Sequence, residues 1–317
     1  MVPKGLRIAA PVPLAQLAEK HGGTVDSGAQ ARFVQRICAL EDGGETDLCP
    51  LTSRRHLAMA LASSAALLVD AQLASLVPPG RRWVHTHASW ALAGVLTDLA
   101  PPEATYGRER ALVDPGAEIA PRVTIGPGAV IMTGVTIGEG SIIEPHVVIY
   151  PRVRLGARVV VGAGAIIGRP GFGWAPGPDG EVRRIPQLGG VWVEDDVEIG
   201  PLATVDAGTL AATLLSRGVR LDAHVHVGHN VEVGEGTMVA AQSGFAGSVK
   251  IGAGVRIGGQ AGIADHVRVG DGARIAAKAG VIGDVPPRDV VAGYPAVDRA
   301  RWLRGVARML SLGGKRK

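Results

Sequence analysis

Aliphatic side chains recur every six residues over more than half of this chain, and no other feature limits the fold so strongly. A helix with 3.6 residues per turn would rotate such side chains around its axis, and a hairpin sheet would alternate every second residue. The period fits short strands joined by tight corners, three to a coil, so residues eighteen apart stack about 4.8 Å apart. The rungs of this ladder are Val113, Ile119, Ile125, Ile131, Ile137, Ile143, Ile149, Leu155, Val161 and Ile167, then Val193, Ile199 and Val205, then Leu215, Leu221, Val227, Val233, Val239, Phe245, Ile251, Ile257, Ile263, Val269, Ile275 and Val281.

Composition agrees with a fold of many turns and short aliphatic strands. Glycine is frequent, at 46 of 317 residues, whereas aromatic residues make up only 3% and hydrophobic residues 46%. That apolar content excludes a disordered chain. The net charge of +4 is too small to indicate nucleic-acid binding, and the basic excess gathers between Arg299 and Lys317, which favours one acidic partner.

Several features predict a soluble protein of the cytoplasm. Cys38 and Cys49 stand in no metal-binding or redox motif, as in a reduced cytosolic chain. The segment from Met1 to Leu14 has three prolines and no long apolar run, so it does not resemble a signal peptide. The most apolar stretch, Leu57 to Val69, is too short to cross a bilayer. We therefore expect no transmembrane segment.

The repeat divides the chain into three parts. Residues 1–107 have no six-residue period, and helical patterns at Leu14–Ala18 and His56–Leu68 with a possible strand at Ala66–Val69 predict a small α/β domain. Residues 108–286 carry the repeat, interrupted by a Gly- and Pro-rich loop at 168–190 and a shorter insertion at 208–214. Residues 287–317 follow a Pro-Pro pair and predict a basic amphipathic helix over 297–312, either a solvated cap or a docking element.

One histidine stands out as a candidate general base. The six-residue ladder resembles that of hexapeptide-repeat acyltransferases, and acyl transfer to an amine needs a base for the amine proton and donors for the oxyanion. His229 follows a rung and a glycine, and Gly247 comes eighteen residues later, one coil above it. A glycine N–H leaves room for a thioester carbonyl. Asp222, seven residues earlier, is a candidate to orient the imidazole, and His266, two coils above and displaced by one residue, is a candidate substrate contact.

The repeat resembles the hexapeptide-repeat acyltransferase superfamily, which are left-handed parallel β-helices that usually form trimers. Particular segments are similar to the family of UDP-3-O-(3-hydroxyacyl)glucosamine N-acyltransferases of lipid A biosynthesis. They are Gly171–Pro176, Arg184–Gly189, Asp195–Gly200, Thr204–Leu210, Val227–Asn230, Ala240–Gln242, Ala246–Ser248, Gly258–Ile263 and Gly293–Ala296. The resemblance covers about 108 to 310.

This resemblance implies transfer of a (3R)-hydroxyacyl chain from acyl carrier protein to the 2-amino group of UDP-3-O-acylglucosamine, without a metal or other cofactor. It implies that His229 is the base and that Gly247 supplies an oxyanion N–H, with uridine bound by the N-terminal domain. Asn230, Gln242 and Phe172 lie in the matching segments and are candidate substrate contacts.

The sequence departs from that family at three places. Ala223 follows Asp222 where the family usually has Asp-Asn. Ala207 stands where the family usually has arginine. In the N-terminal domain, Ser53 and His56 replace the Asn and Tyr of an Asn-Pro-Lys-Tyr element that contributes to the uridine pocket. We expect His56 to stack on the base, and a related sugar nucleotide remains an alternative acceptor.

Three other functions stay open at this point. One is an acetyltransferase that uses acetyl-CoA on another nucleotide amino sugar. A second is a β-helix without catalytic activity. A third is a zinc site at His224, His226 and His229, since β-helix carbonic anhydrases bind metal through histidines; here the inward-facing Val225 separates the first two, which argues against convergence in one subunit.

Overall fold

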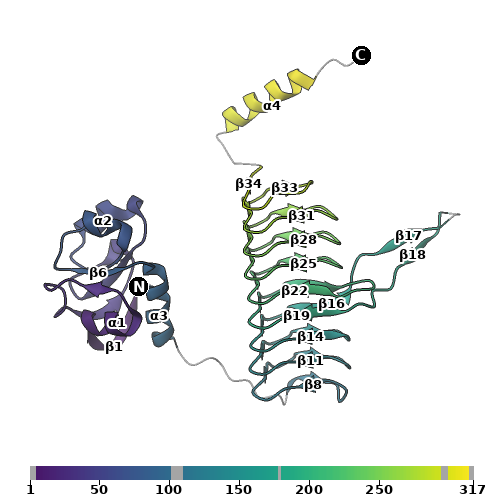
Figure 1. Cartoon of the computed structure of the whole chain (residues 1–317), viewed down its shortest axis with the longest axis horizontal. Coiled ribbons are helices and arrows are strands. Elements are labelled where there is room, and N and C mark those ends of the chain that lie inside the picture. Colours follow the sequence, from purple (N-terminus) through teal and green to yellow (C-terminus); the bar gives the residue numbers. More distant parts are fainter. Residues whose placement is uncertain (1–4, 101–109, 178–179, 294–298, 314–317) are drawn as a thin grey trace. The chain divides into compact units, whose positions relative to one another are not determined.

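The computed structural model describes residues 5–100, 110–177, 180–293 and 299–313. The chain forms two compact units, Met1–Ala104 and Thr105–Lys317. Figure 1 shows the helices and strands of both units.

The N-terminal unit is a six-stranded mixed sheet with helices, in the order β1-β3-β4-β5-β6-β2. β3 to β6 run parallel, whereas β1 and β2 pair antiparallel at the two edges. Its elements are β1 (Leu6–Pro13), α1 (Leu14–His21), β2 (Thr24–Val25), β3 (Phe33–Ile37), η1 (Leu40–Asp42), β4 (Asp47–Leu51), η2 (Arg54–His56), α2 (Leu57–Ala62), β5 (Ala66–Asp70), η3 (Ala71–Leu76), β6 (Arg82–His85) and α3 (Ala88–Leu99).

Both faces of this sheet are buried. Leu48 and Leu68 pack on one side with Trp83, and Leu67 and Val69 pack on the other. Continuous apolar strands are typical of parallel sheets covered on both faces. The expected helix at Leu14 and strand at Ala66 are confirmed, but the helix expected over 56–68 is wrong beyond Ala62, because the chain there enters β5.

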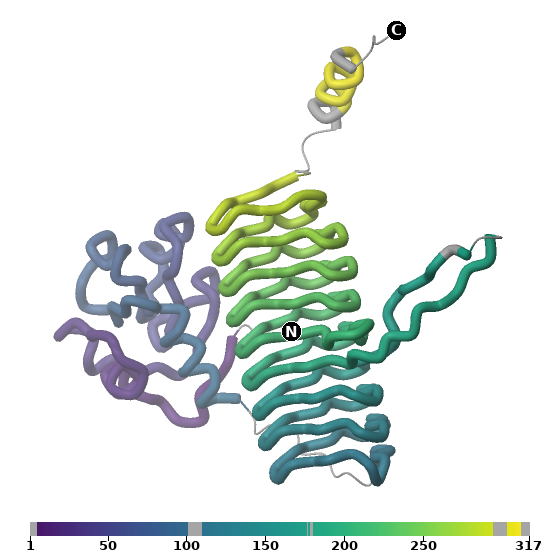
Figure 2. The backbone as a smooth tube through the Cα atoms, turned by 45° about the vertical axis from the view of Figure 1, so that its right-hand side comes forward, coloured from purple at the N-terminus to yellow at the C-terminus, as the bar shows by residue number. Residues whose placement is uncertain are grey.

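The second unit is a parallel β-helix, as the six-residue period predicts. Three parallel sheets wind as a left-handed coil, and each strand pairs with the strand one coil away (Figure 2). Face 1 consists of β7 (Leu112–Val113), β10 (Val130–Ile131), β13 (Val148–Ile149), β16 (Ile166–Pro170), β21 (Thr204–Ala207), β24 (His226–Val227), β27 (Gly244–Phe245), β30 (Gly262–Ile263) and β33 (Gly280–Val281).

The other two faces have the same construction. Face 2 consists of β8 (Glu118–Ile119), β11 (Thr136–Ile137), β14 (Val153–Leu155), β19 (Val191–Val193), β22 (Thr213–Leu215), β25 (Glu232–Val233), β28 (Lys250–Ile251) and β31 (Arg268–Val269). Face 3 consists of β9 (Thr124–Ile125), β12 (Ile142–Ile143), β15 (Val160–Val161), β20 (Glu198–Ile199), β23 (Arg220–Leu221), β26 (Met238–Val239), β29 (Arg256–Ile257), β32 (Arg274–Ile275) and β34 (Val290–Val291).

The rungs form one continuous core inside the prism. Buried hydroxyls that lie between the rungs inside the prism are hydrogen-bonded, as buried polar groups usually are. The hydroxyl of Ser141 donates to Gly156 O and accepts from Val159 N, and that of Thr237 donates to Gly252 O and accepts from Val255 N. Each bridges two coils, so it replaces an apolar contact without leaving a buried polar group unsatisfied.

The loop at 168–190 leaves the prism as a two-stranded antiparallel hairpin. β17 (Trp174–Pro176) pairs with β18 (Val182–Arg184), and the hairpin projects from the coils in Figures 1 and 2. The C-terminal helix, expected over 297–312, is α4 (Arg299–Gly313), with Arg304 and Arg308 exposed. No helix within the described ranges is long and apolar enough to cross a membrane.

The ladder predicts how core substitutions affect stability. Ile143→Ala removes a side chain that is 0% exposed, so it should lower the free energy of unfolding by about 2–5 kcal/mol. Ile282→Ala is the matched control, because Ile282 is 90% exposed, and it should change that energy by less than about 0.5 kcal/mol. Urea denaturation of both variants would measure the difference, and equal effects would contradict an aliphatic core inside the prism.

Candidate active site

His229 lies at the edge where face 1 turns into face 2, between β24 and β25. Two glycines make room for its half-buried imidazole. A Cβ on Gly247, one coil above, would lie 2.6 Å from Nε2 of His229, and a Cβ on Gly171 would lie 2.8 Å from its Cβ. The base of the hairpin and the next coil therefore both pack against this histidine.

Asn230 orients the imidazole. Its Oδ1 lies 3.1 Å from Nδ1 of His229 and accepts the backbone N–H of Thr209 at 3.1 Å. The Thr209 hydroxyl lies 2.8 Å from the same oxygen and 2.7 Å from Oε1 of the buried Gln187. Nδ2 of Asn230 donates to Ala211 O. Since residues from both insertions fix this amide, they also fix the ring beside it.

These contacts select one tautomer of His229. The N–H of Thr209 can only donate, so the Asn230 atom facing it is the oxygen, and Nδ1 of His229 must then carry the proton that this oxygen accepts. In the neutral ring Nε2 is left as an acceptor. Nε2 and Cε1 would both lie 2.6 Å from a Cβ built on Gly247, so the side of the ring that carries Nε2 faces the next coil.

The backbone N–H of Gly247 is available to an anionic oxygen. At the equivalent corners of other coils this N–H binds a carboxylate: Ala157 donates to Asp195 at 2.9 Å, Ala163 to Glu144 at 2.8 Å, and Ala253 to Asp271 at 2.9 Å. Gly247 N has no hydrogen-bond partner within the described part of the chain. The corner that binds anions elsewhere is thus open beside His229, which is the requirement for an oxyanion hole.

A cavity of about 270 Å³ opens between these groups. Its lining includes His229, Gly247 and Phe172, and the Phe172 ring is 81% exposed. Asp206 also lines it, although this residue is only 1% exposed. The cavity joins an imidazole, a backbone N–H without a partner and a buried carboxylate at one edge of the prism.

Asp206 is surrounded by cationic or ionisable groups. Nε of Arg169 lies 3.1 Å from its Oδ1, and Nε2 of His226 lies 3.9 Å from its Oδ2. His226 is in turn fixed by the Thr204 hydroxyl, 2.6 Å from its Nδ1. Burial raises the pKa of Asp206, while Arg169, His226 and His229 act in the opposite direction.

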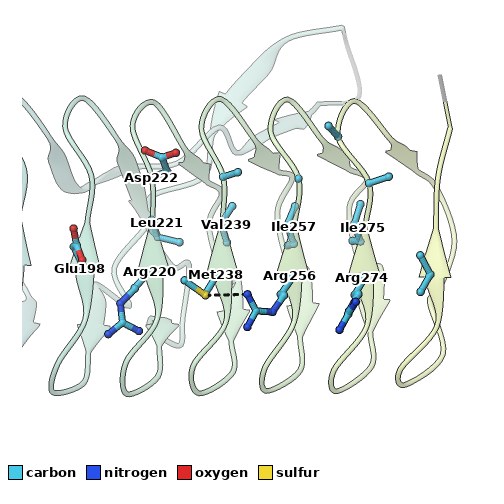
Figure 3. A pocket seen from close by; sticks show the side chains of 15 residues that line it. Glu198, Arg220, Leu221, Asp222, Met238, Val239, Arg256, Ile257, Arg274 and Ile275 are labelled. Carbon is cyan, nitrogen blue, oxygen red and sulfur yellow. Dashed lines mark hydrogen bonds between the residues drawn. The ribbon is translucent and has the colours of Figure 1, made fainter. Parts of the chain in front are cut away.

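The structure does not bring Asp222 to His229 within one chain. Asp222 lies at a different edge, between faces 3 and 1, where its oxygens accept the backbone N–H groups of Ala223 and Ala241. Figure 3 shows it at one end of a groove on face 3. The orienting role expected for Asp222 is taken by Asn230 in this chain, because seven residues span slightly more than one face.

The other expected contacts are spread over the molecule. Gln242 shares the edge of Asp222, where its Oε1 accepts from Gln260. His266 is exposed and lies one coil above Gly247, on the edge of His229, and its backbone N–H donates to Gly247 O. Ser53 and His56 belong to the N-terminal unit, Ser53 as the residue before η2 and His56 as its last residue. Their roles stay predictions.

Sequence reasoning did not select Asp206, Arg169, Thr209 or Gln187. One feature of the sequence could have indicated Asp206: it follows a rung at a position where neighbouring coils have Gly or Ala. The structure offers no support for zinc at His224, His226 and His229: no three His, Cys, Asp or Glu residues of the described segments are grouped to hold a metal ion.

The close approach of Gly247 to His229 generates a prediction. In Gly247→Ala the new Cβ would meet the ring at 2.6 Å, so the imidazole should move about 1 Å and lose its contact with Asn230. A crystal structure of the variant would measure the shift, with faster modification by diethyl pyrocarbonate as a solution readout. Gly283→Ala is the control, because its Cβ would meet nothing within 4 Å. An unmoved ring would contradict the packing described here.

Comparison with known proteins agrees with this fold. The model of the bacterial transferase hexapeptide family (six repeats) matches residues 134–169. Among solved structures, LpxA from Acinetobacter baumannii superposes with a TM-score of 0.53 at 27% identity, over 66% of this chain and 78% of that one. The UDP-N-acetylglucosamine acyltransferase of Francisella novicida gives 0.54 at 27% identity, over 62% and 72%.

Two curated relatives align with nearly the whole chain. The UDP-3-O-acylglucosamine N-acyltransferase of Anaeromyxobacter sp. (strain Fw109-5) is 38% identical over 96% of this chain and 93% of its own length. The enzyme of the same name from Rhizobium meliloti (strain 1021) is 35% identical over 96% and 94%. Identity at this level over both of the units confirms the resemblance found in the sequence. The chain therefore belongs to the UDP-3-O-acylglucosamine N-acyltransferase family and is an acyltransferase.

Proposed function

We propose that this enzyme transfers a (3R)-hydroxyacyl chain from acyl carrier protein to the 2-amino group of UDP-3-O-acylglucosamine in lipid A biosynthesis, with His229 as general base. The observation that carries the proposal is that the His229 ring, with Nε2 left as an acceptor, lies against Gly247, whose N–H has no partner among the described residues. The names of the full-length relatives support the acceptor.

The site accounts for each proton and bond of the reaction. The amine nitrogen attacks the thioester carbonyl carbon while Nε2 of His229 takes one amine proton. The carbonyl oxygen becomes an oxyanion, which the N–H of Gly247 stabilises. The tetrahedral intermediate then collapses, the C–S bond breaks, and the imidazolium returns its proton to the leaving thiolate. Each step is a proton or acyl transfer, so the reaction needs no metal or redox cofactor.

A groove on face 3 supports an acidic donor. It has a volume of about 620 Å³, and Arg220, Arg256 and Arg274 project along one wall (Figure 3). None of the three forms an ion pair with a described residue. Arg256 and Arg274 are direct neighbours on β29 and β32, where like charges are unfavourable, so an acidic carrier would stabilise them. The exposed Arg304 and Arg308 of α4 add to this basic character.

The free thiols of Cys38 and Cys49 support a cytoplasmic location for this chemistry.

Fewer observations bear on how the acceptor is bound than on how the donor is bound. We propose that the N-terminal unit binds its uridine, with His56 stacking on the base in place of the usual tyrosine.

The outer surface of face 1 supports a homotrimer. Leu112, Val130, Val148 and Ile166 stack as an outward aliphatic row, and Leu112 is 71% exposed. Such a row is typical of a surface that another subunit covers. Its upper end leads to the cavity beside His229, so a neighbouring subunit would also close the active site.

We predict that the purified protein sediments as a trimer at micromolar concentration. Val148→Glu should shift it toward the monomer, because a charge would be buried in the aliphatic row. Glu118→Lys, on face 2, is the charge-changing control and should leave the trimer intact. A stable wild-type monomer in analytical ultracentrifugation would exclude this assembly.

The central prediction concerns His229. His229→Ala should lower turnover by roughly 10²–10⁴-fold, the usual contribution of a positioned base. It should leave folding intact, since His229 fills no rung of the ladder. The measurement is product formation by mass spectrometry, with hydroxyacyl carrier protein or acetyl-CoA as donor. The His146→Asn control alters another exposed corner histidine, whose φ of 61° Asn tolerates, and should retain activity.

Two outcomes would decide against the proposal. If His229→Ala keeps more than about a tenth of wild-type turnover, the base lies elsewhere, and His266 becomes the next candidate. If acetyl-CoA replaces the carrier-bound donor at equal efficiency, the enzyme is an acetyltransferase on a nucleotide amino sugar.

A further inference from the structure

One carboxylate in the cavity beside His229 is buried without a hydrogen bond. Asp206 lies in β21, one coil on the N-terminal side of His229, and its side chain is 2% exposed. Its Oδ1 has no hydrogen-bond partner among the residues that the structure describes. Arg169 Nε is 3.1 Å away but outside hydrogen-bonding geometry, and His226 Nε2 is 3.9 Å from Oδ2. A buried polar group of this kind needs an explanation.

The immediate surroundings favour a cationic or strongly donating ligand. Burial raises the pKa of Asp206, and only Arg169, His226 and His229 counter it. The remaining lining near the carboxylate includes Phe172 and Phe245, which offer no hydrogen-bond donor of their own. The missing donor must therefore come from whatever occupies the cavity.

The cavity places the carboxylate with the catalytic groups. Register puts Thr204 beside His226 and Val205 beside Val227, so Asp206 is on the coil directly below Gly228 and His229. Gly247 is on the coil directly above. A molecule in this cavity of about 270 Å³ meets Asp206 on one side, the imidazole in the middle and the Gly247 N–H on the other.

We propose that Asp206 binds the attacking 2-amino group of the acceptor, accepting one N–H while Nε2 of His229 accepts the other. This inference rests on the proposed function. It makes Asp206 a catalytic residue that contacts the reacting nitrogen and selects an amino sugar as acceptor.

The proton balance of the reaction agrees with one amine N–H contacting His229 and the other contacting Asp206. A neutral amine has two N–H groups, and the amide product keeps one. His229 takes the proton that leaves, and Asp206 holds the N–H that remains. When the nitrogen attacks, it gains positive charge in the tetrahedral intermediate, and the carboxylate stabilises that charge in a site with little water. The aligned nitrogen lone pair then points away from both acceptors, toward the thioester carbonyl.

The variant Asp206→Asn tests the role of the charge with almost no change in shape. Turnover should fall roughly ten- to hundredfold, the worth of a charge-assisted hydrogen bond. Calorimetry should compare the acceptor with its 2-deoxy analogue, which has no group at that carbon to donate. The wild type should prefer the amino compound, and Asp206→Asn should reduce that preference by about tenfold.

Asp271→Asn is the matched control. Its carboxylate caps the backbone N–H of Ala253 at another corner, so its loss should leave turnover and preference unchanged. Sedimentation and circular dichroism would show whether Asp206→Asn folds. If it does not, a wild-type preference near one between the two compounds overturns the inference without any variant.

The remaining outcomes separate this inference from the function beneath it. If the wild-type enzyme transfers no acyl chain to the amino sugar, the proposed function itself fails. If transfer occurs and Asp206→Asn keeps both turnover and preference, only the role of Asp206 is overturned. If the variant instead loses a preference for 3-hydroxyacyl over unsubstituted donors, while its amine preference persists, the carboxylate serves the acyl hydroxyl and the inference is wrong.

Discussion

The hydrogen bonds between successive coils determine the rest of this structure. Each coil donates to and accepts from the coils on either side, so a residue stands in line with its counterpart one turn away. Val227 stacks between Val205 and Phe245, and the same alignment carries Asp206, His229 and Gly247 onto one edge. The aliphatic rungs fill the prism, but the backbone register decides which side chains meet outside it. The active site is a product of that register.

The two insertions modify the edge without breaking the register. The ladder resumes after each of them, with β19 pairing to β14 and β22 pairing to β19. Their ends return beside His229: Gly171 packs against its ring, while Gln187 and Thr209 hold Asn230. A β-helix alone offers identical corners at every turn. The insertions make one corner different, which is where loops on a rigid scaffold usually add function.

The sequence predicted the prism, its rungs and the His229–Gly247 pair, because all of these obey one period. It did not predict the neighbours that the insertions bring. Asp206 precedes His229 by 23 residues, and the insertion adds four residues to the usual eighteen between Thr204 and His226, so simple counting does not place it on the adjacent coil. Asp222 precedes His229 by only seven residues, yet it lies at another edge and caps backbone N–H groups there. Whether two residues of a coil can meet depends on the corner that each occupies, and a residue one corner away has entirely different contacts.

Asp222 and Asp206 show how the same scaffold uses one residue type in two ways. At Asp222 each carboxylate oxygen accepts one backbone N–H group, which stabilises the corner. At Asp206 no described backbone N–H group donates to Oδ1, which faces Nε of Arg169 at 3.1 Å outside hydrogen-bonding geometry. Gly247 is the complementary case, an N–H whose carboxylate cap is missing. The Asp206 carboxylate, which lacks a hydrogen-bond donor, lies on one side of the imidazole, and the N–H of Gly247, which lacks an acceptor, lies on the other. The coils are too rigid for these two groups to meet. In the reaction we propose, both groups gain a hydrogen-bond partner when a substrate with an amine on one side and a carbonyl on the other lies between them.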